Sequence, residues 1–504
     1  MNTIVIILVI AAYFGIIFAV SAWTTRRHDG DTNSFYRGNR KSPWYVVAIA
    51  MVGTSISGVT YVSVPGMVAQ SQMSYLQMVL GFVAGYFVVA YVLLPLYYKL
   101  NLSSIYTYLQ QRYGASSHIT GASFFLLSKF LGCAVRMYLT AVVLQLVLFE
   151  PLGIPFAVTV TLMMLVVWIN TYKGGVKTLV WTDLLQTLCL LSAMVGFVFC
   201  VMNSMRLSFS EMTEMIQKSE MSRVWYFDNV NDTRFFWKQF LAGMFTTVAM
   251  TGMDQDMMQK NLSCKSLKEA QKNMVSYGFA FLPVNFIFLT LGILLYAYAM
   301  QLGVCTQSAD GSYLLTDLTG QALKSDQLFP YLATGFNPST GENFLPMAVT
   351  ILFVLGLVSA AFSSAGSAVT SLTTALMVDF PFKLKRTRVH LANAILMGIM
   401  IYIFHLLASG SVINAVYVIA SYTYGPLLGL FFFGLLTKCK PRDKFITIVC
   451  IISPLLCWVL DSNSEAWFGG YHIGYELLLI NGFITAFGLY LISLHEKTKQ
   501  QSHF

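Results

Sequence analysis

Charge is scarce in this sequence. Asp, Glu, Lys and Arg make up 11% of its 504 residues, whereas soluble domains carry about 25%. Hydrophobic residues account for 56%, and apolar runs of about 20 residues recur along the whole length. This composition excludes an ordinary soluble protein and predicts an all-α polytopic membrane protein.

Motifs for several other chemistries are also missing. The eight Cys and seven His show no CxxC and no metal-type spacing, and there is no P-loop, so a disulfide framework, a metal centre and direct use of ATP are not expected. No nucleophile–base constellation appears, so we do not expect an enzyme. The net charge of +9 needs no nucleic acid, because short basic loops lie against anionic lipid.

The apolar runs predict thirteen spans. With the N-terminus outside, the positive-inside rule is obeyed. When Lys residues at the ends of spans are counted with the adjoining side, 23 of the 31 Lys and Arg are cytoplasmic, 6 are external and 2 lie well within spans. We therefore expect a multi-pass plasma-membrane protein (inner membrane if bacterial) with a cytoplasmic C-terminus. The predicted spans are 3–22, 45–70, 74–99, 119–149, 153–170, 178–202, 236–258, 275–303, 343–380, 389–408, 411–437, 443–460 and 473–494.

Two of these spans contain helix-breaking residues. "GTSISG" is bracketed by Gly53 and Gly58, and five spans later "MTGMDQDMM" carries an intramembrane Asp254 and Gln255. Many transporters place one broken helix in each of two inverted repeats. We therefore predict a single transmembrane domain over 1–504, with repeats at 45–202 and 236–437, an extra helix at 3–22 and two C-terminal helices at 443–494. Close helix packing is the alternative explanation for such glycines.

The stretch "SAAFSSAGSAVT" places four Ser inside an apolar span. Hard cations take oxygen ligands, and neutral oxygens suit a monovalent ion. The set that could hold sodium comprises the hydroxyls of Ser363 and Ser364 and the carbonyls of Ala360, Gly53 and Ile56. Bonding of the hydroxyls to carbonyls of their own helix is the alternative.

Charged residues inside spans are costly and need a partner or a function. Arg136 presents a planar fork that suits a carboxylate, but it could instead pair with Asp183 or Asp254. Asp183 could likewise form a structural pair with a basic residue. Lys129 lies nearer its helix end, where snorkelling is the simple explanation.

Several stretches, taken together, resemble the sodium/solute symporter family, which includes carriers of sugars, proline, sialic acid, iodide and vitamins. They are "GTSISGVTYVSVPG", "GGVKTLVWTDLLQ", "DQDMMQKNLSCKSLKEAQ", "SAAFSSAGSAVTSLTTALMVDF" and "GPLLGLFFFGLLTK". The resemblance implies a LeuT-type five-plus-five inverted repeat and Na⁺ as the coupling ion. It places sodium on the same five residues, Gly53, Ile56, Ala360, Ser363 and Ser364.

The resemblance also bears on a second sodium ion and on the solute. Asp183 and Ser367 match a second sodium site, although Gly366 stands where another hydroxyl would be. Separately, the 254–271 stretch has Lys260 where Arg is usual. The candidate solute ligands are Ser55, Ser57, Thr60, Gln77, Arg136, Asp254 and Gln255. Ser57, Thr60 and the Arg136–Met137 pair resemble the sialic acid carriers.

We therefore expect a sodium-coupled symporter that imports a small organic acid or acidic sugar such as sialic acid. Its expected partners are a small, anionic solute and the lipid bilayer, with no obligate protein partner. The alternatives are a proton-coupled carrier on the same scaffold, a symporter of neutral sugars or amino acids, and a non-transporting sensor. The absence of a Gln in "NAVYVIASYTYGP" counts against a neutral sugar.

Overall fold

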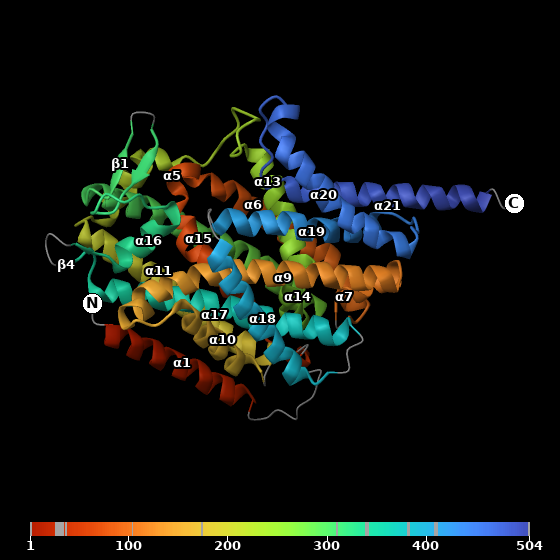
Figure 1. Cartoon of the computed structure of the whole chain (residues 1–504), viewed down its shortest axis with the longest axis horizontal. Coiled ribbons are helices and arrows are strands. Elements are labelled where there is room, and N and C mark those ends of the chain that lie inside the picture. The colour runs from red at the N-terminus through yellow and green to blue at the C-terminus, as the bar shows by residue number, and fades with distance from the viewer. Residues whose placement is uncertain are drawn as a thin grey trace.

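The computed structural model describes residues 3–25, 35, 38–102, 104–172, 175–308, 311–337, 342–380, 384–407 and 412–501. Long helices run roughly side by side, and α21 projects from one end (Figure 1). The main helices are α1 Thr3–Thr25, α3 Trp44–Ser55, α4 Gly58–Gly66, α6 Tyr75–Val88, α7 Leu94–Lys99, α9 Ala115–Leu144, α10 Phe156–Thr171, α11 Gly175–Ser204, α13 Phe236–Thr247, α14 Gln255–Leu262, α15 Leu267–Gln301, α17 Met347–Val378, α18 Arg386–Leu407, α19 Val412–Leu436, α20 Asp443–Trp467 and α21 Leu477–Gln501.

Shorter elements lie in the connections between these helices. They include two small antiparallel hairpins, so the fold is helical rather than strictly all-α. The short helices are α5 Val68–Ser71, α8 Thr107–Arg112, α12 Phe209–Lys218 and α16 Ser325–Thr334, and the strands are β1 Cys305–Gln307 paired with β2 Tyr313–Leu315 and β3 Phe336–Asn337 paired with β4 Glu342–Asn343.

Ten described helices are long and apolar enough to cross a membrane, or eleven if the bent pair α3–α4 counts as one span. The chain is therefore a multi-pass membrane protein. Each of the thirteen predicted spans overlaps a helix or an interrupted helix. Two of them fall outside the length criterion, because α10 has 16 residues and the span of α13 and α14 is interrupted.

The first predicted break is present. Helix α3 ends at Ser55, Ile56 is extended, and Ser57 caps α4, its hydroxyl accepting from the Thr60 N–H at 3.5 Å. The two helices meet at 61°. Serine favours this position because its hydroxyl replaces a missing backbone acceptor. In the described backbone, no hydrogen bond from Ser57 or Gly58 continues the α3 ladder.

The two glycines beside this break serve close packing. A Cβ at Gly53 would lie 1.9 Å from Thr187 Oγ1 of α11, and one at Gly58 would lie 2.1 Å from Thr140 Oγ1 of α9. Both explanations of this segment are therefore correct. The two glycines allow close helix packing, and the helix breaks between them at Ile56 and Ser57.

The second break is built differently. Helix α13 passes into a π-helical turn at Val248–Gly252 before α14 begins. Asp254 caps α14, its Oδ1 accepting from the Asp256 N–H at 2.8 Å. A carboxylate suits this place because a helix N-terminus attracts negative charge.

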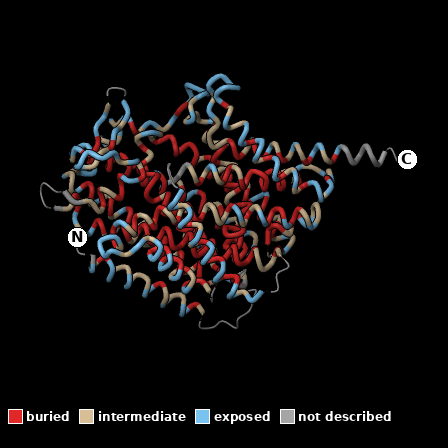
Figure 2. The backbone as a smooth tube through the Cα atoms, in the orientation of Figure 1, coloured by how far each residue is buried: buried red, intermediate tan, exposed pale blue. Residues whose placement is uncertain are grey.

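Helix α17 lies in the centre of the bundle. In the most apolar 18-residue segment of α17, 72% of the residues are buried. The corresponding share is 11% in α1 and 22% in α20. Burial is concentrated inside the bundle, and exposed residues follow its periphery (Figure 2). The Ser-rich segment of α17 is therefore held among neighbouring helices rather than facing lipid.

Candidate solute and cation site

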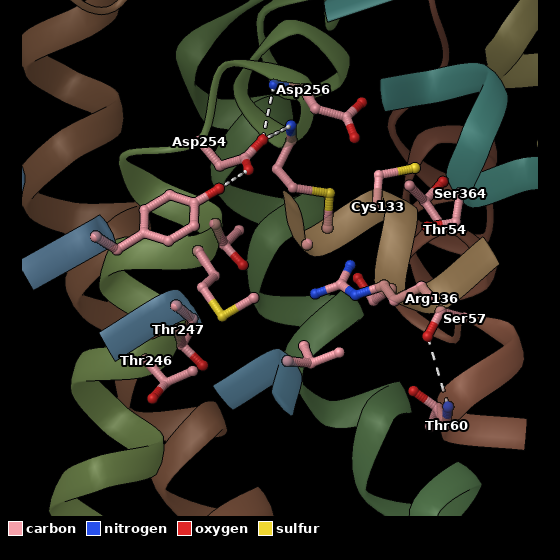
Figure 3. A pocket seen from close by; sticks show the side chains of 18 of the residues that line it. Thr54, Ser57, Thr60, Cys133, Arg136, Thr246, Thr247, Asp254, Asp256 and Ser364 are labelled. Atoms are coloured by element: carbon pink, nitrogen blue, oxygen red, sulfur yellow. Dashed lines mark hydrogen bonds between the residues drawn. The ribbon is translucent and has the colours of Figure 1, made fainter. Parts of the chain in front are cut away.

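A cavity lies between the two broken helices (Figure 3). Side chains from α3, α4, α6, α9, the α13–α14 connection, α15, α17 and α19 line it. Its polar lining comprises Thr54, Ser55, Ser57, Thr60, Tyr75, Tyr86, Ser128, Lys129, Arg136, Thr246, Thr247, Thr251, Asp254, Asp256, Tyr277, Ser364, Tyr417 and Tyr424.

Arg136 of α9 points into this cavity (Figure 3). Its side chain is half-buried, and no residue in the described part of the chain forms an ion pair or hydrogen bond with its guanidinium. The two carboxylates that could have neutralised it are engaged elsewhere. The guanidinium therefore faces the cavity as an available cation.

Asp254 is held by Lys129 of α9. Lys129 Nζ lies 3.2 Å from both Asp254 oxygens and 2.8 Å from Asp256 Oδ2, and the Tyr424 hydroxyl donates to Asp254 Oδ2 at 2.5 Å. The Lys129 side chain is 13% exposed. The snorkelling explanation for Lys129 is therefore wrong, because the ammonium group turns inward to a carboxylate pair.

Asp183 is held by Lys260 of α14. Lys260 Nζ lies 2.5 Å from Asp183 Oδ2 and also contacts the Thr54 hydroxyl, and both side chains are almost fully buried. The Ser367 hydroxyl donates to the same Oδ2 at 3.2 Å. The residues predicted for a second sodium ion therefore meet in space, but an ammonium group lies among them.

Ser363, one of the residues predicted for the first sodium ion, lies beside the broken helix. Ser363 Oγ lies 3.3 Å from Thr54 Oγ1, so α17 meets the broken helix at this level. Neither Ser363 nor Ser364 bonds to a carbonyl of its own helix in the described contacts, unlike Thr373 and Thr374 further along α17. Hydroxyls and the carbonyls released at the break offer the neutral oxygens that a hard monovalent cation prefers.

The predicted solute ligands on α4 line the cavity. Ser57 and Thr60 lie on the first turn of α4, close to Arg136 (Figure 3). The Ser55 hydroxyl contacts the Tyr277 hydroxyl, which accepts from Tyr86 at 2.8 Å. These hydroxyls make the part of the cavity next to the first break polar.

Gln77 and Gln255 are not brought to the cavity. Gln77 Nε2 donates to the Arg234 carbonyl at 2.8 Å and its Oε1 accepts from the Tyr226 N–H at 3.2 Å, so Gln77 fastens the loop between α12 and α13. Gln255 Oε1 accepts from the Ile105 N–H at 3.0 Å. Both amides are buried and neither lines the cavity, so they are not retained as solute ligands.

Several cavity residues were not selected from the sequence. Thr246, Thr247 and Thr251 surround the second break and line the cavity, and the hydroxyl cluster in "FTTVAMTG" is the signal that could have indicated them. Tyr75 and Tyr417 also line the cavity, with their hydroxyls 3.0 Å apart.

Tyr61 of α4 has a packing role. Its side chain is fully buried among the rings of Phe288, Phe329 and Phe353, with ring centroids 5.4–5.9 Å apart. It does not line the cavity.

A membrane-embedded helix bundle with two broken helices around a charged cavity has the architecture of a secondary transporter. Residues 35–440 match the model of the sodium:solute symporter family, and the chain belongs to this family. The family consists of transporters coupled to Na⁺, which agrees with the expectation that the chain is not an enzyme.

The chain is similar to the sodium/sialic acid symporter NanT of Aliivibrio fischeri, with 23% identity over 503 residues, 94% of this chain and 91% of that protein. It is also similar to the sodium-coupled monocarboxylate transporter 2 of Mus musculus, with 25% identity over 444 residues, 85% of this chain and 66% of that protein. Among solved structures, a substrate-bound outward-open Na⁺-coupled sialic acid symporter covers 97% of both chains, with a TM-score of 0.76 and 19% identity. The chain therefore shares this symporter's LeuT-like fold.

Proposed function

We propose that this chain imports an acidic sugar such as sialic acid by sodium symport. The observation that carries the proposal is the cavity-facing guanidinium of Arg136, which has no ion-pair partner in the described part of the chain. A carboxylate matches its planar fork with two parallel charge-assisted hydrogen bonds.

The remainder of the cavity supports a polyhydroxylated solute. Ser57, Thr60, Thr246 and Thr247 offer hydroxyls that can both donate and accept. Tyr75 and Tyr417 close one side of the cavity with amphipathic rings. A sugar ring that carries one carboxylate and several hydroxyls uses both kinds of group, whereas a simple monocarboxylate leaves most of the hydroxyls without a partner.

The names of the relatives support the same chemistry. The similar proteins include a sodium/sialic acid symporter and a sodium-coupled monocarboxylate transporter, and the solutes in both names carry a carboxylate. The hydroxyl-rich lining favours the acidic sugar over the simpler acid.

Sodium is proposed to bind between α17 and the break in α3–α4. The carbonyls of Gly53, Ile56 and Ala360 and the hydroxyls of Ser363 and Ser364 would be its ligands, so that a bound ion fixes the angle of the broken helix. Ser55, Ser57 and Thr60 lie at this break and line the cavity, where they would face the solute. Coupling follows when each ligand binds the outward and inward states with different affinity.

The finer topology is also part of the proposal. Thirteen spans would cross the membrane, with the N-terminus outside and the C-terminus in the cytoplasm, since the Lys and Arg distribution then obeys the positive-inside rule. The domain would comprise inverted repeats at 45–202 and 236–437. The high exposure of α1 and α20 in the bundle agrees with their place as additions to this core.

Thermal-shift measurements on the purified protein test the choice of solute. Sialic acid, a simple monocarboxylate and a neutral hexose would each be added with and without Na⁺. We expect sialic acid to raise the Tm more than the other two, and to do so only with Na⁺. Stabilisation by the neutral hexose alone would contradict the proposal.

A further inference from the structure

Asp183 already holds a cation that belongs to the protein. The Lys260 ammonium lies 2.5 Å from Asp183 Oδ2, and the exposure of the two side chains is 1% and 0%. Thr54 and Ser367 donate to the same oxygen, each at 3.2 Å. A single carboxylate oxygen thus joins residues of α3, α11, α14 and α17.

The Lys260 ammonium contacts both the Asp183 carboxylate and the Thr54 hydroxyl. Through this contact the ammonium group links α3, the helix before the first break, to α14, the helix after the second break. Lys260 reaches the point from α14 by its own long side chain, whereas a sodium ion would have to enter from water. The protein therefore supplies from α14 the positive charge that Asp183 requires.

We propose that the Lys260 ammonium is the resident cation of the Asp183 site, so that the chain binds one sodium ion per transport cycle rather than two. This inference rests on the proposed sodium coupling and concerns its stoichiometry. The sodium ion that remains would be the one at Ser363 and Ser364.

The local charges support a single ion. Lys260 neutralises Asp183, so a further sodium ion would bring an uncompensated positive charge into a buried site, which is costly. The nearby Asp256 does not compensate it, because Lys129 lies 2.8 Å from that carboxylate.

The ligands that would be left for a second sodium ion are also few. Among the described residues, Asp183 Oδ1 has no hydrogen-bond partner, but it belongs to a carboxylate whose charge is already balanced by Lys260. Gly366 provides no hydroxyl, and a Cβ there would lie 3.2 Å from Thr171 Cγ2.

The test measures equilibrium binding of ²²Na⁺ to the purified full-length protein without any organic solute. We expect one ion per wild-type chain. Lys260→Ala and Lys260→Gln free the Asp183 carboxylate, and both variants should bind two ions. Their Tm should also rise more steeply with Na⁺ concentration than that of the wild type. Lys260→Arg retains the tethered charge and should still bind one ion.

The outcomes separate this inference from the proposed function. Two ions on the wild type would overturn the inference while leaving sodium coupling in place, and no bound ion would overturn both. A folded Lys260→Ala that still binds one ion would show that Lys260 is only a structural partner. If neither neutral variant folds even in saturating Na⁺, sodium cannot replace the ammonium group and the inference is likewise wrong.

Discussion

Lys129, and not Arg136, holds the carboxylate of Asp254: the Lys129 ammonium lies 3.2 Å from both Asp254 oxygens. Asp183 is engaged in the same way by Lys260, at 2.5 Å. Both carboxylates that could have neutralised Arg136 are thus already paired. Because these two carboxylates are paired with lysines, the Arg136 guanidinium remains available to bind the carboxylate of a solute.

Replacing Arg136 by Lys should weaken solute affinity by about 1.5–3 kcal/mol, the usual contribution of a charged hydrogen bond. The charge is retained, but a single ammonium group cannot match both carboxylate oxygens as a guanidinium does. Titration with labelled solute measures this change. Sodium binding measured without solute should stay unchanged, since the proposed sodium ligands lie on other helices. Normal solute affinity in the variant would make Arg136 a structural residue.

Replacing Lys129 by Met should destabilise the protein, because it leaves two buried carboxylates without their cation. Breaking a buried pair in this way costs about 3–5 kcal/mol, and a lowered Tm in detergent reports it. Lys218→Met is the matched control, because Lys218 forms a pair with Glu214 that is 75% and 61% exposed and such helix pairs contribute only about 0.3–0.5 kcal/mol. Equal Tm values for the two variants would contradict the buried-pair assignment.

Replacing Ser364 by Ala should raise the half-saturating sodium concentration roughly tenfold or more, as expected for the loss of a hydrogen-bond-strength contact to a charged group. The variant should still fold, because the Ser364 hydroxyl makes no hydrogen bond in the described part of the chain. Ser371→Ala serves as the control, since that hydroxyl donates to the Ala368 carbonyl of its own helix at 2.9 Å. An unchanged sodium dependence in both Ser363→Ala and Ser364→Ala would remove these residues from the site.

Replacing Gly53 by Ala should abolish sodium-dependent stabilisation and lower the Tm. The new Cβ would lie 1.9 Å from Thr187 Oγ1 and 3.2 Å from Thr187 Cα, so α3 must move away from α11. Gly15→Ala on α1 is a suitable control, because nothing lies within 4 Å of a Cβ at that position. Thr187→Gly combined with Gly53→Ala should recover part of the loss. A Gly53→Ala variant with wild-type Tm would mean that this packing contact is not needed.

The features that local sequence dictates were predictable. Gly53 and Gly58 indicated the break, and the apolar runs gave the helices with their approximate bounds. The Ser pair on α17 stood out because hydroxyls in an apolar span need an explanation. Among the described contacts, neither hydroxyl bonds to a carbonyl of its own helix, and that of Ser363 instead meets Thr54.

The tertiary partners of long polar side chains could not be predicted in the same way. Gln77 and Gln255 lie close to the breaks in sequence. In the fold, however, the side-chain oxygen of each accepts a hydrogen bond from a backbone N–H that is distant in sequence. Lys129 and Lys260 paired with carboxylates 125 and 77 residues away. Such pairings depend on where four or more helices converge, which no local pattern encodes.

The central claim is that a sodium gradient drives uptake of an anionic sugar through the Arg136 cavity. Its most direct test is uptake of radiolabelled sialic acid into proteoliposomes in which sodium and pH gradients are imposed separately. The account predicts concentrative uptake with an inward sodium gradient at equal pH, and only equilibration with a pH gradient in the absence of sodium. Concentrative uptake driven by the pH gradient alone would contradict it and favour a proton-coupled carrier.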